Sequence, residues 1–251
     1  MAIQGVVFDL GHTLMYLDST WPEVFEQGVA DLAAFLTGQG LDLDGEALAR
    51  ALLDRRKEAF VQANETMREV TAKDSMRWTF ARFGLPDPDP ALVSGAIGAF
   101  FAYEDRHWLA YPGAPAVLSE LAGCGLRLGM FSNATHDPLI QRLVDRLGFR
   151  PWLDPALTSA RMGIRKPHPA AFAPILAAWG LPPESVVMVG DTLEADVLGA
   201  QRAGMRSVWI RSRQDARQEG SGHDEPGQPD RIVPNATITS LGELPTCLET
   251  L

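Results

Sequence analysis

Residues 5–14 read GVVFDLGHTL, a short and nearly continuous apolar run that ends at the carboxylate of Asp9. An apolar run without polar alternation is typical of a strand buried on both faces, as in a parallel sheet. Open parallel sheets bind their ligands at the carboxyl ends of the strands. We therefore expect Asp9 to lie at the functional edge of a sheet.

Beyond residue 110 the pattern alternates between helices and strands. Asp137 is expected to cap one helix, Ile238 to lie in a last short strand, and the polar residues 212–230 to form a loop. This alternation predicts an α/β fold with a doubly wound parallel sheet. The expected helices are 114–123, 137–147, 169–179, 195–203 and part of 241–251, and the expected strands are 126–131, 157–159, 186–189 and 207–210.

A block of helical patterns separates the first strand from this alternating part. Apolar side chains recur at helical spacing from residue 19 to residue 108, and no strand pattern is convincing there. Thr20 or Ser19, together with Asp44 and Asp89, are suited to cap three of the expected helices. We expect an all-helical domain of residues 16–109, inserted into an α/β core of residues 1–15 and 110–251.

The composition argues against several classes of protein. The formal net charge of −10 disfavours nucleic acid and anionic membranes as partners, because both require a basic face. The two cysteines are too few for a disulfide scaffold and lack the spacing of metal ligands. We find no signal peptide and no apolar run near the ~18 residues that span a bilayer. A cytoplasmic protein is expected, and its oligomeric state is not defined by these patterns.

Polar side chains follow several of the expected strands. Ser132-Asn133 follows strand 126–131, Lys166 precedes helix 169–179, and Gly190-Asp191 follows strand 186–189, with Asp196 five residues further on. Together with Asp9, these loops are expected to place carboxylates, a hydroxyl and a cation at one edge of the sheet.

Converging carboxylates repel one another unless a cation neutralises them. Mg²⁺ prefers oxygen ligands and usually retains waters and a substrate phosphate. Once their charge is compensated, a free carboxylate can attack phosphorus and form an acyl phosphate. Lys166 and Ser132 are suited to stabilise the charge on the transferring phosphoryl oxygens. The loops therefore predict phosphoryl transfer to a carboxylate.

Four segments resemble, in the correct order, the motifs of the haloacid dehalogenase superfamily. The third and fourth motifs are specific in this combination, and the helical block lies where that family carries an α-helical cap. The matching segments are Phe8-Asp9-Leu10-Gly11-His12-Thr13-Leu14, Met130-Phe131-Ser132-Asn133, Gly163 to Pro169 with Lys166-Pro167 inside it, and Val189 to Gly204 with Gly190-Asp191 and Asp196 inside it.

The resemblance implies a role for each matching residue. Asp9 would be the catalytic nucleophile, and Ser132 and Lys166 would act in catalysis by binding the transferring group. Asn133 and His12 are further candidates for substrate binding, although Asn133 can instead tie down its own loop. Mg²⁺ would be held by Asp9, the backbone carbonyl of Gly11, Asp191 and Asp196. The expected function is a Mg²⁺-dependent phosphatase of a small phosphorylated metabolite.

Position 11 departs from the pattern of family phosphatases. These enzymes usually carry a second aspartate two residues after the nucleophile, which protonates the leaving group, and here that residue is Gly11. Loss of a general acid typically costs about 10²–10⁴-fold in rate. Either His12 or a cap residue supplies the proton, or the leaving group needs little protonation, or the enzyme breaks another bond.

The third explanation keeps two rival enzymes open. Family dehalogenases lack the second aspartate but do not need a metal, whereas the pair Asp191 and Asp196 favours one. Phosphonate-cleaving members use a cap lysine, for which Lys57 and Lys73 are candidates. A catalytically weak binding protein with the same fold is the alternative from another class. Trp21 and Trp108 are expected to pack in the core.

Overall fold

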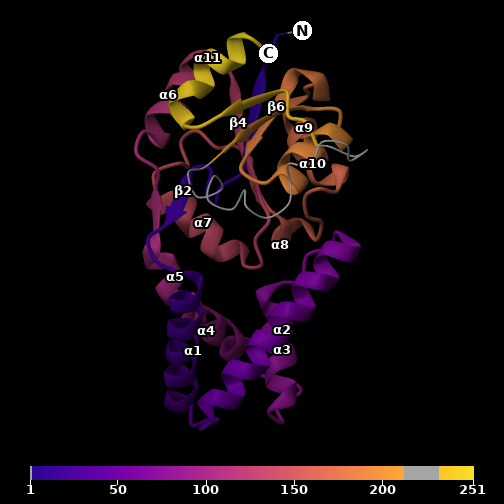
Figure 1. Cartoon of the computed structure of the whole chain (residues 1–251). Helices are drawn as coiled ribbons and strands as arrows, with labels where there is room; N and C mark the ends of the chain where they lie inside the picture. Colours follow the sequence, from indigo (N-terminus) through magenta and orange to yellow (C-terminus); the bar gives the residue numbers. More distant parts are fainter. Residues whose placement is uncertain (1, 212–231) are drawn as a thin grey trace, which may run out of the picture.

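A parallel sheet with the strand order β5-β4-β1-β6-β7-β8 forms one half of the protein (Figure 1). The computed structural model describes residues 2–211 and 232–251, so the expected loop 212–230 lies outside the described residues. All neighbouring strands of this sheet pair in parallel, which confirms the predicted α/β class. The strands are β1 (Gly5–Phe8), β4 (Arg127–Ser132), β5 (Ala156–Thr158), β6 (Val186–Gly190), β7 (Arg206–Ile210) and β8 (Ala236–Ile238).

Helices cover both faces of the sheet. Successive side chains of β1 point to opposite faces, so they pack against both layers of helices. Val6 and Phe8 pack into the core cluster that contains residues of α6, α7 and α11. Val7 packs into the opposite cluster with residues of α9 and α10. Figure 1 shows α6 and α11 on one side of the sheet and α9 and α10 on the other. These helices are α6 (Ala114–Gly123), α7 (Asp137–Arg146), α9 (Ala173–Trp179), α10 (Leu198–Arg202) and α11 (Leu244–Glu249), and a short α8 (Ser159–Met162) follows β5.

The other half of the protein is helical and has its own apolar core. Leu32, Leu48, Phe80 and Ile97 are among its buried residues and come from four different helices. Thr20, Asp44 and Asp89 accept hydrogen bonds from the first backbone N–H groups of their helices, as predicted. The helices are α1 (Trp21–Gly38), α2 (Gly45–Thr66), α3 (Ala72–Arg82), α4 (Pro90–Phe100) and α5 (Ala102–His107).

Two strands that the sequence analysis did not predict join the halves. β2 (Met15–Leu17) and β3 (Trp108–Ala110) pair in an antiparallel ribbon, so the chain enters and leaves the helical half at the same point. Within the described ranges 2–211 and 232–251, none of the helices has the length and apolar character needed to cross a bilayer.

Three local predictions were wrong in detail. His136, not Asp137, is the N-cap residue of α7, and Asp137 instead accepts a hydrogen bond from Thr158 Oγ1 at 2.8 Å. The expected helix 169–179 is divided into a 3₁₀ turn and α9, since Pro174 has no N–H to continue the helix. The expected helix 195–203 begins as a π-helical turn, Leu193–Val197, before α10.

Candidate active site

Asp9 and Lys166 form the centre of the candidate site. Asp9 directly follows β1, and its backbone N–H donates to Val189 O at 2.8 Å, which extends the pairing of β1 with β6. Lys166 Nζ lies 2.6 Å from Asp9 Oδ1 and 2.7 Å from Asp196 Oδ1. All three residues are buried. The structure therefore brings together three loops that the sequence placed at the same edge of the sheet.

The charges of this buried triplet depend on one another. Burial raises the pKa of Asp9 to about 6, against the opposing effect of the Lys166 ammonium, and the neighbouring Asp196 carboxylate raises it further. Burial alone would lower the pKa of Lys166, but Asp196 and Asp9 outweigh it and hold that pKa above its ordinary value. Lys166 is therefore charged at neutral pH and compensates two acids at once.

Asn133 fixes the backbone of Lys166. Its Nδ2 donates to Lys166 O at 2.9 Å, and Lys166 N donates to Asn133 Oδ1, also at 2.9 Å. This reciprocal pair joins the loop after β4 to the loop that carries the lysine. Ser132 is buried at the end of β4, beside β1. The geometry gives Asn133 a positioning role, while substrate binding by Asn133 and Ser132 stays a prediction.

Gly190 allows Asp196 to lie against the end of β6. A Cβ atom at position 190 would meet Asp196 Oδ2 at 2.2 Å, far inside contact distance. Thr192 N donates to the same oxygen at 2.9 Å. Asp191 is held through its backbone, since Trp209 Nε1 donates to Asp191 O at 2.8 Å. Position 190 therefore requires a glycine, because the Asp196 carboxylate packs directly against its Cα.

The donor set at this point consists of oxygens. Among residues 2–211 and 232–251, no group of three or more His, Cys, Asp and Glu side chains is arranged to hold a metal. Two carboxylates do converge, those of Asp9 and Asp196, and the buried Oδ1 of Asp196 receives no hydrogen bond of ordinary geometry. Mg²⁺ is commonly held by one or two carboxylates together with waters and substrate phosphates. The residues therefore fit Mg²⁺ in this mode, and the larger set with Gly11 and Asp191 stays a prediction.

Trp108 covers position 11. A Cβ atom at Gly11 would lie 3.5 Å from Trp108 Cη2, an ordinary contact distance. His12 has a positive φ of 57° and meets the Trp108 ring edge-on, with 5.6 Å between the ring centroids. Trp21 also meets the Trp108 ring edge-on, with 6.1 Å between the ring centroids. The Trp108 ring, in contact with His12 and Trp21, therefore lies next to position 11, where family phosphatases carry the second aspartate side chain.

One of the two tryptophans packs in the core as expected, and the other does not. Trp108 is buried in the core cluster that contains Phe8 and also contacts His12, whereas Trp21 is 43% exposed and was wrongly assigned to the core. Glu104 was missed altogether, although Trp108 Nε1 donates to its Oε1 at 3.1 Å. Burial raises the pKa of Glu104, and the hydrogen bond from Trp108 and the charge of Arg56 oppose this effect. Only the spacing of four residues between Glu104 and Trp108 hints at this contact.

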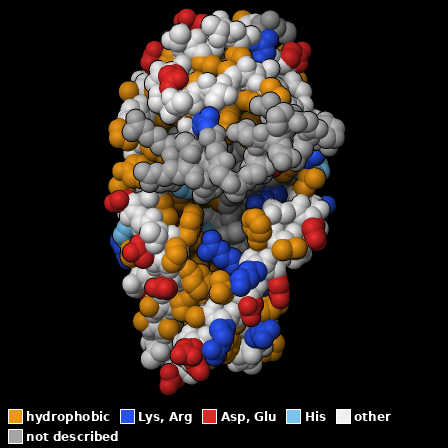
Figure 2. Space-filling view, viewed as in Figure 1, with side chains coloured by type: hydrophobic (Ala, Val, Ile, Leu, Met, Phe, Trp, Pro, Cys, Tyr) orange, Lys and Arg blue, Asp and Glu red, His pale blue; other side chains and the backbone are white. Residues whose placement is uncertain are grey.

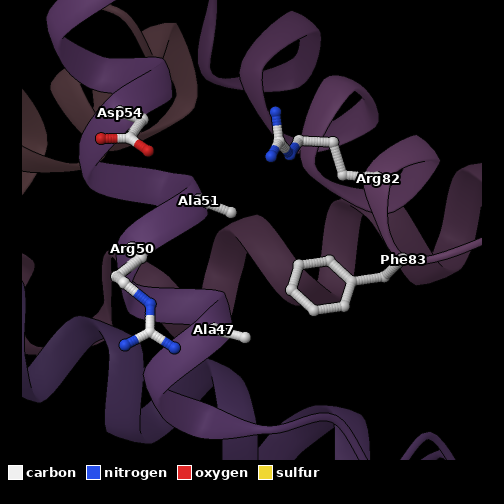
Figure 3. A pocket seen from close by; sticks show the side chains of 6 residues that line it. All are labelled: Ala47, Arg50, Ala51, Asp54, Arg82 and Phe83. Atoms are coloured by element: carbon white, nitrogen blue, oxygen red, sulfur yellow. The ribbon is translucent and has the colours of Figure 1, made fainter.

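A separate pocket lies inside the helical half (Figure 3). It has a volume of about 360 Å³, and its side chains come from α2, α3 and the residue that follows α3. None of the predicted site residues lines it, so we do not assign it to the reaction. The lining residues are Ala47, Arg50, Ala51, Asp54, Arg82 and Phe83.

Comparisons with known proteins agree with this geometry. The model of the haloacid dehalogenase-like hydrolases matches residues 3–204. A glyceraldehyde 3-phosphate phosphatase of Methanopyrus kandleri is 30% identical, over 83% of this chain and 84% of that protein. A phosphoserine phosphatase of Thermus thermophilus is 40% identical over 45% of this chain and 44% of that protein.

Solved structures share the fold at low sequence identity. A 2-haloacid dehalogenase from Pseudomonas syringae pv. Tomato superposes with a TM-score of 0.71 at 24% identity, covering 99% of both chains. A HAD phosphatase from Thermococcus onnurineus gives a TM-score of 0.62 at 21% identity, covering 98% of both. With the family match over residues 3–204 and the convergence of Asp9, Lys166 and Asp196, the chain belongs to the haloacid dehalogenase-like hydrolases and is a hydrolase.

Proposed function

We propose that this protein is a Mg²⁺-dependent phosphatase of a small phosphorylated metabolite, with Asp9 as the nucleophile. The observation that carries the proposal is the contact of one buried ammonium, Lys166 Nζ, with both Asp9 and Asp196. Relatives named as glyceraldehyde 3-phosphate and phosphoserine phosphatases support this substrate class. A cytoplasmic location and the absence of nucleic acid and membrane partners remain predictions.

In the proposed reaction, an Asp9 carboxylate oxygen attacks phosphorus. The bond from phosphorus to the leaving oxygen breaks, and the leaving group departs as an anion with the bonding electron pair and takes up a proton from solvent afterwards. Lys166 Nζ and the Ser132 hydroxyl donate hydrogen bonds to the phosphoryl oxygens, whose charge must be stabilised in the transition state. Water then attacks the acyl phosphate at phosphorus, which restores Asp9 and releases phosphate.

Mg²⁺, held by the carboxylates of Asp9 and Asp196, would supply charge neutralisation between the phosphate and the acids. Asn133 keeps the lysine in place through its two hydrogen bonds to the Lys166 backbone. Nothing at Gly11 can protonate the leaving group. The substrates that fit this site best are therefore phosphates whose leaving groups are stable without a proton, such as acyl or aryl phosphates.

We propose that the helical half, residues 16–109, acts as a cap that closes over the substrate and excludes water. Figure 2 shows Lys and Arg side chains interspersed with Asp and Glu side chains on the helical half in the view of Figure 1. The second candidate is dehalogenation, which the absence of an acid at Gly11 favours.

Hydrolysis of p-nitrophenyl phosphate, measured with Mg²⁺ and with EDTA, tests the proposal. We expect turnover with Mg²⁺, loss of turnover with EDTA, and a loss of about 10³-fold or more in Asp9→Asn, since the nucleophile is removed. Equal turnover in EDTA, or halide release from a 2-haloacid, would instead identify a dehalogenase. Failure to hydrolyse any member of a phosphate panel would contradict the phosphatase assignment.

A further inference from the structure

Residues 67–72, here called the docking segment, run from the end of α2 to the first residue of α3 and reach the α/β half. Arg165 N donates to Met67 O at 3.1 Å, and Glu69 N donates to Gly163 O at 3.2 Å. An antiparallel bridge pairs Arg68 with Ile164 between these two hydrogen bonds. The docking segment thus adds a short strand-like contact to the loop that immediately precedes Lys166.

A second loop holds the other end of the docking segment. Ala72 N donates to Thr135 O at 2.8 Å. Thr135 lies two residues after Asn133, on the loop that begins at the end of β4. The docking segment therefore contacts both loops that the proposed reaction uses, one with Asn133 and one with Lys166.

The side chain of Glu69 anchors this contact. Its exposed fraction is 2%, and Ser159 Oγ donates to Glu69 Oε2 at 2.6 Å. Arg165 Nη1 lies 3.9 Å from the other oxygen, Oε1. Ser159 is fully buried and also accepts a hydrogen bond from Ala134 N at 2.9 Å. One hydroxyl thus joins Glu69 of the helical half to the residue next to Asn133.

The buried carboxylate of Glu69 is unusual at a contact between two halves of a protein, where apolar side chains would pack at lower cost. Removing a carboxylate from water costs several kcal/mol unless it is hydrogen-bonded, and pairing returns only part of that cost. Glu69 is therefore stable in its site when Ser159 bonds to it, and is well hydrated when the helical half moves away. This balance gives a contact that is specific but readily released, as a closing cap requires.

The docking segment and Asn133 hold two consecutive backbone N–H groups of the loop that carries Lys166. Met67 O accepts from Arg165 N, and Asn133 Oδ1 accepts from the next backbone N–H, that of Lys166. If the docking segment moves away, the hydrogen bond from Arg165 N to Met67 O is lost, whereas the hydrogen bond from Lys166 N to Asn133 remains. A displacement of about 1 Å can cost about 10²-fold in rate where groups must be aligned.

We infer that Glu69 is a positioning residue: its hydrogen bond with Ser159 docks residues 67–72 onto the loops of Asn133 and Lys166 and so aligns Lys166 with Asp9. This inference rests on the proposed phosphatase reaction, in which Lys166 binds the transferring group. Glu69 acts through the lysine loop and is given no contact with the substrate.

Four variants of the full chain test the inference. Glu69→Ala and Ser159→Ala remove one partner each, and Glu69→Gln keeps an oxygen that accepts from Ser159. Asp89→Ala is the matched control, because it removes the N-cap of α4, at a cost of about 1 kcal/mol, without touching the docking segment. All four are assayed with p-nitrophenyl phosphate and Mg²⁺.

We expect kcat to fall about 10- to 100-fold in Glu69→Ala, with a KM that changes far less, because alignment and not binding is lost. Glu69→Gln should return to within about threefold of the wild type, since a neutral hydrogen bond is weaker than a charged one but keeps the geometry. Asp89→Ala should stay within about twofold, because a helix cap affects stability and not the site. Wild-type kcat in both Glu69→Ala and Ser159→Ala would overturn the inference.

Amide hydrogen exchange provides a readout that does not depend on activity. Peptides covering residues 163–168 should exchange about tenfold faster in Glu69→Ala and Ser159→Ala than in the wild type or Asp89→Ala. Unchanged exchange in both variants would overturn the inference even if kcat fell. Should the wild type hydrolyse no phosphate ester, the proposed function fails, and the docking by Glu69 then stands or falls on exchange alone. If Glu69→Ala does not fold, Ser159→Ala and Glu69→Gln provide the same comparison.

Discussion

Lys166 Nζ lies 2.6 Å from Asp9 Oδ1, although 157 residues separate the two along the chain. The same ammonium lies 2.7 Å from Asp196 Oδ1, so one cation serves two buried acids. Removing one member of a buried ionic group leaves the others uncompensated, which is far more costly than losing an exposed ion pair. Lys166 is therefore expected to contribute both to the folding stability of the protein and to the proposed reaction at Asp9.

Lys166→Met is expected to reduce both stability and turnover. Asp9 and Asp196 would face each other without a cation, and we expect a loss of about 3–5 kcal/mol in unfolding free energy at pH 8. Without the ammonium, the pKa of Asp9 rises further above its ordinary value. The folded state then binds more protons than the unfolded state, so stability falls as the pH rises.

Urea unfolding of the wild type and Lys166→Met, compared at pH 5 and pH 8 without added metal, measures this effect. The deficit of the variant should be smaller at pH 5. A deficit that is equal at both pH values would show that the ammonium does not control the charge of Asp9.

Gly190→Ala is expected to displace Asp196. The added Cβ atom would lie 2.2 Å from Asp196 Oδ2, so the carboxylate has to move. We expect a loss of about 1–3 kcal/mol, as for other overpacked sites, together with weaker Mg²⁺ dependence of turnover. Gly98→Ala is the matched control, since a Cβ there meets nothing within 4 Å. If the two variants behave alike in chemical denaturation and in Mg²⁺ titration of activity, the proposed close approach is wrong.

Gly11→Asp is expected to change which leaving groups are accepted. The wild-type kcat/KM should fall steeply as the pKa of the leaving group rises from aryl to alkyl phosphates, because position 11 offers no proton. An aspartate there should flatten this dependence, and pairing it with Trp108→Phe should provide room, because Trp108 lies 3.5 Å from a Cβ at position 11. A wild-type enzyme that cleaves alkyl phosphates as fast as aryl phosphates has another acid, and His12→Ala would then be the next variant.

His136 is expected to make the protein sensitive to mild acid. Burial and nearby Arg142 lower its pKa to about 4, and its ring stacks on Phe101 of the helical half at 5.0 Å. A histidine with a depressed pKa contributes stability that is complete above its unfolded pKa of about 6.5. That contribution is lost as the pH falls toward about 4.

His136→Phe keeps a ring against Phe101 but cannot take up a proton. Its unfolding free energy should fall less than that of the wild type between pH 7 and pH 4, measured by urea denaturation. Parallel curves for the two proteins over this range would contradict the depressed pKa.

Much of the fold could be predicted because it depends on local patterns. The apolar run before Asp9 and the alternation after residue 110 follow from the burial of parallel strands, and the caps Thr20, Asp44 and Asp89 are local signals. The short strands β2 and β3 were missed because each spans only three residues and their pairing joins distant parts of the chain.

The site was predictable only where a loop follows a strand. Asp9, Lys166 and Asp196 could be placed at one edge because parallel strands bring their carboxyl ends together. The contact of Glu69 with Ser159 spans 90 residues and depends on how the helical half is oriented, which no local pattern encodes. Glu104 was missed for a different reason: it lies four residues from Trp108, a spacing common in helices, and its burial beside Trp108 is evident only in the folded protein.

The phosphoenzyme provides the most direct test of the account. Purified protein is mixed with Mg²⁺ and p-nitrophenyl phosphate, quenched in acid within the first turnovers, digested and analysed by mass spectrometry. We expect a single phosphoryl group on the peptide that contains Asp9, and none in Asp9→Asn. Steady turnover with no phosphoryl group on Asp9, or turnover that survives Asp9→Asn, would contradict the assignment of this residue as the nucleophile.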